Sequence, residues 1–455
     1  MDKFDLISPL DYRYASGKYA DFLGENARIK YQARVEASLV KALAKQGVCS
    51  GKIAGQIAKA AKRVKASEVY EEEARIKHDV RALANVIRKK VSKEAKPFVH
   101  FGATSYDIVD TASALRYKEA TLKLLIPELK KLQSSWIKIA LREKATVQVG
   151  RTHGQFASPI TFGFFIAGYV NRIGGRISSL EWCANNLKGK FSGAVGAYNA
   201  TSLIVRDPLK LENDIMKDLG LEVSMHSTQI VEPESLEDLL HCIISSFAVL
   251  ANFADDMRHL QRSEISEVAE AFAGKQVGSS TMPHKRNPIN FENVKSLYKQ
   301  FAPRMTTVYL DAISEHQRDL TNSASARFIP ELFAGLLVST ERLQKVSGNL
   351  VVDRRSMRQN FEKAASTIIA EPLYILLAAN GHNNAHEAVR QLTLQAEKTG
   401  KSLPELAEAK KELKPFVQKF SKKEWKMLEN PETYIGLSVK KTAQVCGYWK
   451  KKFKN

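Results

Sequence analysis

The stretch ESLEDLLHCIISSFAVLANFADDMRHLQRS, residues 234–263, decides the fold class of this chain. Its apolar side chains recur at helical spacing, which predicts one helix from Glu234 to about Ser263 with a single apolar face. The residues on that face are Leu236, Leu239, Leu240, Ile243, Phe247, Leu250, Ala254 and Met257. A helix of this length must bury its apolar face against other helices, so we expect a helical bundle.

Two further segments predict long helices. The pattern from about Asp110 to Lys144 is helical throughout, with a kink expected near Pro127 because proline removes a backbone donor. The segment from Pro159 to Leu187 is apolar on most sides, which is typical of a helix buried among other helices or subunits. Additional helices are predicted for Glu25–Gln46, Gly51–Val64 and Pro288–Ala302. These patterns together predict an all-α fold with a central bundle of long helices.

The composition is that of a soluble globular protein. The chain has 455 residues, 44% hydrophobic and 26% charged, which is enough for two or three domains around a substantial core. The N-terminus carries acids where a signal peptide has its basic region, and the longest apolar run, 160–170, is too short to span a bilayer. We therefore expect an unexported protein. The four cysteines lack the spacing of a disulfide framework or a zinc site: Cys49, Cys183, Cys242 and Cys446.

The net charge of +20 is the unusual feature of the composition. It suits nucleic acid, an acidic surface or a polyanionic small substrate. The only dense basic run is Lys-Lys-Lys-Phe-Lys at 450–454, which is typical of a solvated tail. No helix-turn-helix, RNA-binding aromatic motif or zinc finger accompanies it. We expect no membrane partner and no specific nucleic-acid partner.

The segment Gly-Ser-Ser-Thr-Met-Pro-His-Lys-Arg-Asn-Pro, residues 278–288, combines hydroxyls, a cation and an amide. Its glycines and prolines predict a mobile loop that ends where Pro288 opens a helix. The spacing places a potential base, Ser279, near Lys285, Asn287 and a helix N-terminus, which suits a carboxylate. The ordinary alternative is a polar surface loop in which Asn287 caps the helix.

Other segments carry residue types that suit an anionic substrate. Arg13 matches phosphate bidentately, or it belongs to an arm packed by its tyrosines. Thr104 and Ser105 precede a helix, where they bind a carboxylate or simply cap the helix. His153 lies between glycines at the junction of two long helices, a place for a positioned acid or base or for a structural histidine. The segment 317–327 supplies two arginines and a serine, which form a phosphate clamp or a solvated helix face.

These segments resemble the motifs of the adenylosuccinate lyase family, within the fumarase/aspartase superfamily. The resemblance runs from residue 9 to about residue 331, and the C-terminal hundred residues are much less diagnostic. It rests on Asp-Tyr-Arg-Tyr at 11–14, Lys-His-Asp-Val at 77–80, Thr104-Ser105 with Asp107, Arg-Thr-His-Gly-Gln at 151–155, Ser-Thr-Gln at 227–229, the loop at 278–288 and Gln-Arg-Asp-Leu-Thr-Asn-Ser at 317–323.

The resemblance implies β-elimination of fumarate in purine nucleotide biosynthesis. The substrates are polyanionic succinyl nucleotides: adenylosuccinate, giving AMP, and the succinylaminoimidazole carboxamide ribotide SAICAR, giving AICAR. It implies a cytoplasmic enzyme without a metal or organic cofactor. It also implies a homotetramer with composite active sites, in which subunits share the central bundle. We expect three helical domains: 1–108, 109–352 with the loop at 278–288, and 353–455.

The resemblance also implies roles for individual residues. Ser279 is the expected general base, with Ser280 as the alternative, and His153 is the expected general acid that protonates the departing nitrogen. Lys285 would lower the electrostatic cost of ionising the serine, and Glu292 would orient His153. The expected substrate-binding residues are Arg13, Tyr14, Lys77, His78, Asp79, His100, Thr104, Ser105, Gln229, Asn287, Arg318, Ser323 and Arg327.

Three other interpretations stay open at this point. Another fumarate-releasing lyase or a carboxymuconate cycloisomerase also carries Met-Pro-His-Lys in this loop, although the motifs at 77–80 and 151–155 favour the first interpretation. A non-catalytic structural protein, like the lens crystallins of this superfamily, is disfavoured because Ser279, His153 and Lys285 are all present. A basic nucleic-acid binder is the third.

Overall fold

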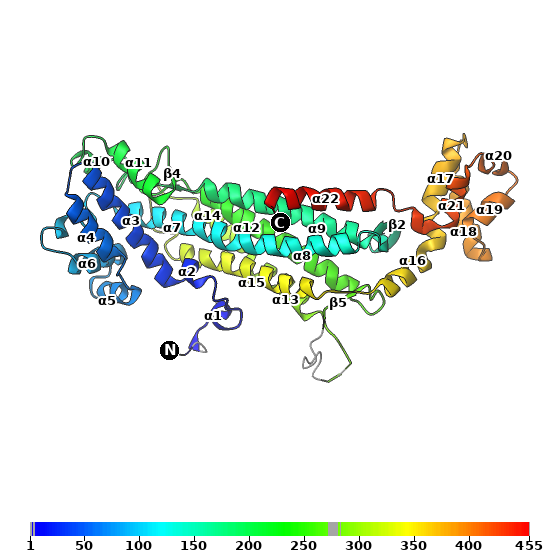
Figure 1. Cartoon of the computed structure of the whole chain (residues 1–455), viewed down its shortest axis with the longest axis horizontal. Helices are drawn as coiled ribbons and strands as arrows, with labels where there is room; N and C mark the ends of the chain where they lie inside the picture. The colour runs from blue at the N-terminus through cyan, green and yellow to red at the C-terminus, as the bar shows by residue number, and fades with distance from the viewer. Residues whose placement is uncertain (1, 3–4, 272–280, 283, 455) are drawn as a thin grey trace. The chain divides into compact units, whose positions relative to one another are not determined.

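The computed structural model describes residues 2, 5–271, 281–282 and 284–454. These residues are predominantly helical, with a few short strands, which confirms the all-α fold class (Figure 1). The N-terminal helices are α1 (Pro9–Tyr12), α2 (Ala20–Leu23), α3 (Glu25–Lys45), α4 (Gly51–Ala61), α5 (Ala66–Ile76) and α6 (Asp79–Lys89). The long helices are α7 (Ser105–Ala120), α8 (Ile126–Arg142), α9 (Phe162–Asn185), α12 (Glu234–Leu260), α13 (Ile289–Phe301) and α15 (Ile329–Gly348).

Shorter elements complete the described chain. The remaining helices are α10 (Asn199–Ser202), α11 (Pro208–Leu219), α14 (Arg304–Asp311), α16 (Arg354–Ile368), α17 (Ala370–Ala379), α18 (Ala385–Thr399), α19 (Leu403–Ala409), α20 (Lys414–Val417), α21 (Lys422–Glu429) and α22 (Ser438–Phe453). The strands form three two-stranded pairs: β1 (Val147–Thr152) with β2 (Gln155–Thr161), β3 (Lys188–Gly189) with β4 (Glu222–Val223), and β5 (Val268–Ala269) with β6 (Val351–Val352).

The chain divides into two compact units, each assembled from three separate segments. Unit 1 comprises residues 1–130, 175–251 and 294–342. Unit 2 comprises residues 131–174, 252–293 and 343–455. The division falls within α8, α9, α12, α13 and α15, so each of these helices contributes residues to both units.

Aromatic side chains join the helices inside unit 1. The ring of Phe247, on α12, lies 5.7 Å from Tyr298 and 6.1 Å from Phe301 on α13. Tyr117, on α7, stacks on Phe333 of α15 at 5.0 Å. Buried aromatic pairs contribute about 0.5–1.5 kcal/mol beyond their buried area. The predicted packing of long helices through apolar faces is therefore present in this unit.

The core of unit 2 is built in the same way. The ring of Phe253, on α12, lies 4.3 Å from Trp136 of α8, 5.2 Å from Tyr169 of α9 and 6.4 Å from Phe291 of α13. The indole N–H of Trp136 donates to Ser347 Oγ at 3.0 Å, so the buried ring leaves no unpaired donor. The helix α12 is also long and apolar enough to cross a membrane, but 61% of its most apolar window is buried inside the protein. Its hydropathy is explained by its position in the core.

The predicted break near Pro127 takes the form of a π-helical turn. Residues 121–125 form this turn between α7 and α8, and the N–H of Ile126 donates to the carbonyl of Thr121, five residues earlier. Pro127 has no N–H, and its ring would clash with the carbonyl of Lys123 in a regular α-helix. The wider turn in front of it accommodates the ring while the helical path continues.

The prediction of a helix from Pro159 is wrong for its first residues. Residues 155–161 instead form β2, which pairs antiparallel with β1, and α9 begins at Phe162. Pro159 lies opposite Val149 in this pair. Proline lacks the donor that a helix interior or a central strand requires, but a two-stranded ribbon has free edges that tolerate it.

Candidate active site

In unit 1, the N-terminus of α7 organises several of the predicted substrate-binding residues. Thr104 is the N-cap of α7, as predicted, and its N–H donates to the Asp107 carboxylate at 2.9 Å. Thr104 and Ser105 are both half-buried. A helix N-terminus with hydroxyls beside it favours an anion.

A buried ion pair fixes this helix end to the glycine-rich turn at 189–199. Lys190 Nζ lies 2.5 Å from Asp107 Oδ1, and both side chains are fully buried. Gly193 completes the arrangement: its N–H donates to Asp107 at 3.2 Å, and its carbonyl accepts from Lys190 at 3.1 Å. Because the charges and remaining hydrogen-bonding atoms are satisfied together, removing one partner typically costs about 3–5 kcal/mol.

Arg318 and Gln229 are brought to the same part of unit 1. The guanidinium carbon of Arg318 lies 3.5 Å from the ring centroid of Tyr106, one residue after Ser105, and its NH2 donates to Asn322 at 2.9 Å. The buried NH1 of Arg318 has no hydrogen-bond partner among the described residues. An open guanidinium donor of this kind is suited to a carboxylate or phosphate oxygen. Gln229 lies close to Arg318, because its backbone N–H donates to the carbonyl of Gln317, the residue before Arg318, at 3.3 Å.

Tyr106 and Asp110, which the motif analysis did not single out, are perturbed by this environment. Burial raises the pKa of Tyr106, an effect that Arg318 partly offsets. Burial raises the pKa of Asp110 to about 6, although its hydrogen bond from the Val231 N–H at 2.9 Å acts in the opposite direction. Perturbed groups of this kind cluster at functional sites. The sequence could have indicated both residues, because they follow Ser105 by one and five positions on the same helix.

His100 is paired with a buried carboxylate. Its Nδ1 lies 2.6 Å from Glu36 Oε1, its backbone N–H donates to Glu36 Oε2 at 3.1 Å, and its φ is +59°. Burial alone would lower the pKa of His100, but the charge and hydrogen bond of Glu36 outweigh it and raise the pKa. Since Glu36 occupies Nδ1, Nε2 is the ring nitrogen left for a ligand.

Lys77 and His78 are exposed at the turn between α5 and α6. Lys77 has φ +57° at the end of α5, and His78 is the N-cap of α6, where its Nδ1 accepts from the Arg81 N–H at 3.3 Å. Asp79 follows in the first turn. The charge of Asp79 acts on Tyr106 in the first turn of α7. The contacts of the described residues do not connect five others with the α7 N-terminus: Arg13, Lys77, His78, Ser323 and Arg327. Tyr14 is half-buried directly after α1.

In unit 2, His153 lies at the tip of a β-hairpin, not at a helix junction as predicted. His153 and Gly154 form the two-residue turn between β1 and β2, with φ +55° and +76°. Positive φ at both positions is typical of the type I′ turn, whose twist matches a hairpin. The bulge at Gly150 also requires glycine, because a Cβ there would lie 2.5 Å from the Ser158 carbonyl oxygen. His153 is exposed, so this arrangement presents the imidazole to the outside of the unit.

Glu267 holds this hairpin in place, and the motifs did not reveal it. Its fully buried carboxylate accepts from Gln148 at 2.7 Å, from Arg151 at 2.7 Å and from Asn360 of α16 at 3.0 Å. A cavity of about 750 Å³ lies beside the hairpin and is lined by Arg151, Phe156 and other side chains of unit 2. Arg151 lies two residues before His153, so its bond to Glu267 fixes the strand end from which the imidazole projects.

The loop at 278–288 is described only in part. The predicted bases, Ser279 and Ser280, lie outside the described residues. Lys285 is exposed, and its N–H donates to the Met282 carbonyl at 3.0 Å. Asn287 is half-buried, and its carbonyl accepts from the Ile289 N–H at 2.9 Å.

Glu292 and His153 are not in contact within this chain. Glu292 lies in the first turn of α13 and is exposed. Among the described residues, no hydrogen bond or ion pair joins its carboxylate to the imidazole of His153. The predicted orienting role therefore has no support from contacts within one chain.

A buried carboxylate, Glu270, joins the segment that precedes this loop to the start of α13, which follows it. It accepts from the N–H of Asn290 at 2.9 Å, from the N–H of Phe291 at 3.0 Å and from the Asn290 side chain at 2.6 Å. Gln261 spans the same ends, since it accepts from the Glu270 N–H at 3.0 Å and donates to the Arg286 carbonyl at 3.2 Å. We expected the amides at the start of α13 to be open to a substrate anion, but Glu270 already occupies two of them.

The described residues contain no group of three or more His, Cys, Asp or Glu side chains that could hold a metal ion. The polar groups that the structure gathers are carboxylates paired with cations, amides and hydroxyls. Such a set is suited to binding an anion and to moving protons.

Comparisons with known proteins cover almost the whole chain. The Lyase family model matches residues 14–301, and the adenylosuccinate lyase C-terminal model matches residues 314–435. The second match covers much of the C-terminal part, where the sequence motifs were least informative. The adenylosuccinate lyase of Pyrococcus horikoshii is 36% identical over 97% of this chain and 98% of its own length. The adenylosuccinate lyase of Archaeoglobus fulgidus is 34% identical over 97% of this chain and 98% of its own length.

Solved structures show the same fold at lower identity. The 3-carboxy-cis,cis-muconate lactonizing enzyme of Pseudomonas putida superimposes with a TM-score of 0.83 at 23% identity, covering 97% of this chain and 99% of that one. A fumarate lyase of Mesorhizobium sp. BNC1 superimposes with a TM-score of 0.82 at 21% identity, covering 95% of this chain and 98% of that one.

Proposed function

The chain belongs to the adenylosuccinate lyase family, and from that premise we propose that it releases fumarate from adenylosuccinate, giving AMP, and from SAICAR, giving AICAR. It is a lyase of carbon–nitrogen bonds. The observation that carries the proposal is identity of 34–36% with adenylosuccinate lyases along nearly the full length of both chains. The polyanionic substrates also suit a chain with a net charge of +20.

The reaction places two requirements on the site. A base must remove a weakly acidic proton from the carbon next to a carboxylate, and the carbanion that forms spreads negative charge onto that carboxylate. An acid must protonate the departing nitrogen. Lys285 and Asn287 are our candidates for donors to the charged carboxylate, and losing one such donor typically costs about 100- to 1,000-fold in rate.

We assign the two proton transfers to residues of unit 2. Ser279 is the general base, with Ser280 as the alternative, and Lys285 favours the ionised serine. His153 is the general acid. The braced hairpin supports this assignment, because Glu267 and Arg151 hold the strand ends while the imidazole remains accessible. Glu292 orients the imidazole from a neighbouring copy of the chain.

Substrate binding is assigned to the neighbourhood of the α7 N-terminus. Thr104 and Ser105 bind a carboxylate, Gln229 contacts the substrate, and Arg318 uses its open NH1 donor for an anionic oxygen. We assign further substrate contacts to other residues of unit 1, namely Arg13, Tyr14, Lys77, His78, Asp79, His100, Ser323 and Arg327, and to Asn287 of unit 2.

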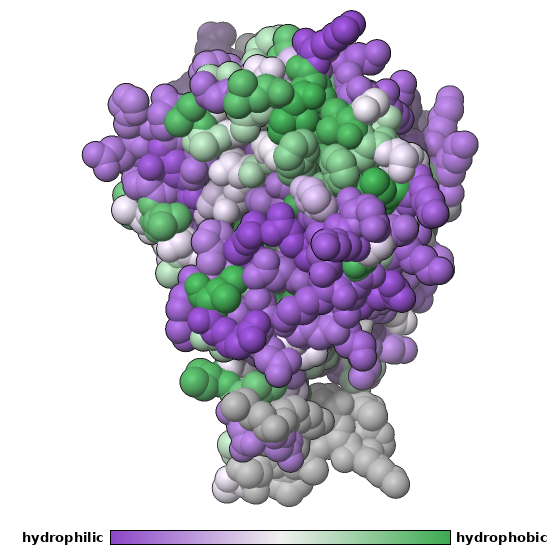
Figure 2. All heavy atoms as spheres, turned by 90° about the vertical axis from the view of Figure 1, so that its left-hand side faces the viewer, coloured by the Kyte–Doolittle hydropathy of each residue, from purple (hydrophilic) through white to green (hydrophobic). Residues whose placement is uncertain are grey.

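We propose that the enzyme is a homotetramer with composite active sites. His153 and Glu292 are exposed and make no mutual contact, so a second copy is needed to supply one to the other. Figure 2 shows apolar side chains gathered on part of one face of the molecule. Several large apolar residues of unit 1 are exposed: Leu203, Leu209, Met225, Leu310 and Ile313. Apolar side chains that gather on a surface often mark a protein interface.

Light scattering tests the assembly. We expect a mass four times that of the chain, and we expect activity to be lost together with the tetramer on dilution or on mutation of the interface. A monomer that retains full activity would contradict the proposal, because one chain would then hold a complete site.

We also propose a soluble, cytoplasmic enzyme that uses neither metal nor organic cofactor. The three-domain division at 1–108, 109–352 and 353–455 remains a proposal as well. Independent expression of residues 353–455 would test the last boundary, since a domain should unfold cooperatively by itself.

A direct assay tests the function. The purified chain should consume adenylosuccinate and SAICAR with stoichiometric release of fumarate, followed by absorbance and by chromatography of AMP and AICAR. Turnover of 3-carboxymuconate without turnover of either succinyl nucleotide would favour the cycloisomerase alternative. Absence of turnover with all three substrates would favour a non-catalytic structural protein.

The anchoring of the loop gives a further prediction. Replacing Glu270 with alanine removes the carboxylate that holds both loop ends, and we expect kcat for fumarate release to fall about 100-fold, as expected for a misplaced catalytic group. Glu264→Ala is the matched control, because Glu264 lies on the same segment and is exposed. Circular dichroism melts of both variants separate loss of rate from loss of fold. Equal rates for the two variants would contradict the anchoring role.

A further inference from the structure

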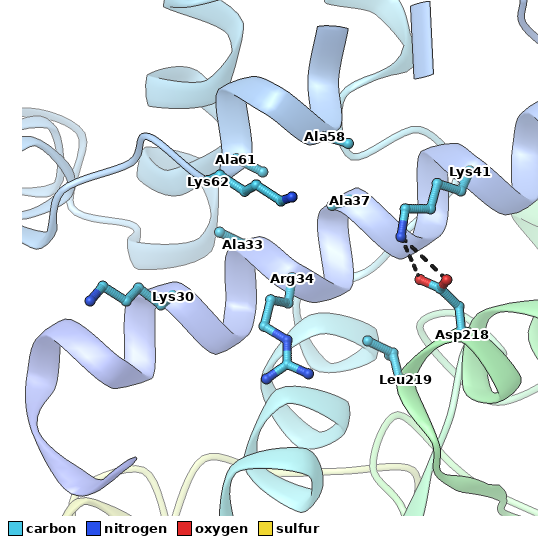
Figure 3. Close-up of a pocket in the computed structure, with 10 residues that line it drawn as sticks. All are labelled: Lys30, Ala33, Arg34, Ala37, Lys41, Ala58, Ala61, Lys62, Asp218 and Leu219. Carbon is cyan, nitrogen blue, oxygen red and sulfur yellow. Dashed lines mark hydrogen bonds and ion pairs between the residues drawn. The ribbon is translucent and has the colours of Figure 1, made fainter. Parts of the chain in front are cut away.

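A hollow between α3 and α4 in unit 1 has no part in the proposed reaction (Figure 3). Its volume is about 460 Å³, and the end of α11 forms its third side. Ala33 and Ala37 on α3, Ala58 and Ala61 on α4, and Leu219 form an apolar lining. The hollow exists because methyl side chains line both helices where larger residues would fill the space.

Four cations surround this apolar lining, and two of them are already paired. Arg34 donates to the Glu119 carboxylate at 3.2 and 3.3 Å. Lys41 donates to Asp218, the only acid that lines the hollow, at 2.9 and 3.2 Å. The single negative charge of the lining is therefore neutralised by its neighbour.

The side-chain ammonium groups of the other two cations, Lys30 and Lys62, have no hydrogen-bond or ion-pair partner among the described residues. Figure 3 shows the Lys62 side chain lying between α4 and α3, on the side of Ala33 and Ala37. Lys30 also lines the hollow, with its ammonium group directed away from Ala33 in Figure 3. Together with Lys62 it gives this edge of the hollow a positive potential, which favours a ligand with at least two negative charges.

We propose that this hollow binds a nucleoside phosphate. Lysine ammonium groups bind phosphate as point charges, so Lys30 and Lys62 can follow a flexible phosphate chain. The alanine lining offers no hydrogen bonds but accepts a flat ring, whereas inorganic phosphate would gain nothing from it. Small-molecule sites commonly have about 300–1,000 Å³ and combine apolar walls with a few polar groups. The proposal goes beyond the reaction above and does not depend on it.

Calorimetric titration of the full chain with ATP tests this site. Lys62→Ala should weaken ATP binding about 10-fold, as expected when a charged hydrogen-bond donor is lost. Lys59→Ala is the matched control, because Lys59 is exposed on the same helix but does not line the hollow. Both variants should keep kcat and KM for adenylosuccinate, which separates this site from nucleotide binding at the active site.

Two further titrations test the apolar lining. Ala58→Leu fills part of the hollow without changing its charge, and it should weaken binding of ATP but not of inorganic triphosphate. Adenosine should bind far more weakly than ATP. The proposal is overturned if Lys62→Ala leaves ATP affinity unchanged, if Lys59→Ala weakens it equally, or if inorganic triphosphate binds wild-type protein as tightly as ATP does.

Discussion

Replacing His153 lowers kcat for fumarate release by about 100-fold or more, the effect expected for losing a general acid. The structure determines which replacement is informative. His153 has φ +55°, a conformation that strains alanine but that asparagine tolerates. His153→Asn should therefore preserve the hairpin turn and lose the rate, while His153→Ala should lose the rate and some stability as well.

The pH dependence of kcat tests whether the role lost in the His153 variants is that of a general acid. A general acid must carry its proton to donate it, so wild-type kcat should fall at alkaline pH, where the acid has lost that proton. That alkaline limb should be absent in His153→Asn, which a purely structural role would not cause. His226→Ala, another exposed histidine, is the control and should retain both rate and profile. If the His153 variants remain near wild type, the acid is another histidine, and His78 is the first candidate.

Replacing Ser279 with alanine should also lower kcat by about 100-fold or more, because the proton next to the carboxylate then has no positioned base. The thermal unfolding midpoint should be unchanged, since only one hydroxyl oxygen is removed. Substrate binding should survive, so the expected loss is in kcat and not in KM.

Ser280→Ala is the control for this experiment, because the two serines are adjacent and chemically identical. We expect Ser280→Ala to retain most of the activity. The opposite result, a large loss for Ser280→Ala and none for Ser279→Ala, would assign the base to Ser280. Full activity in the double variant would remove both serines from the mechanism.

The elements with a clear period were predictable. The apolar face of α12 was read from spacing alone, and Leu239, Ile243 and Phe247 are buried as expected. The cap at Thr104 was also predictable, because a helix N-terminus depends on neighbouring residues in the sequence. The hairpin was missed because its strands are short and Pro159 suggested a helix start.

Sequence by itself determined the helical class, the family motifs and the identity of the residues to which the chemistry is assigned. Each of these depends on residue type and on spacing within a few turns. The tertiary structure alone decided how those residues are held: Asp107 by Lys190, Arg151 by Glu267, and the ends of the loop by Glu270. A buried carboxylate needs partners to offset its lost hydration, and those partners come from segments that only folding brings together.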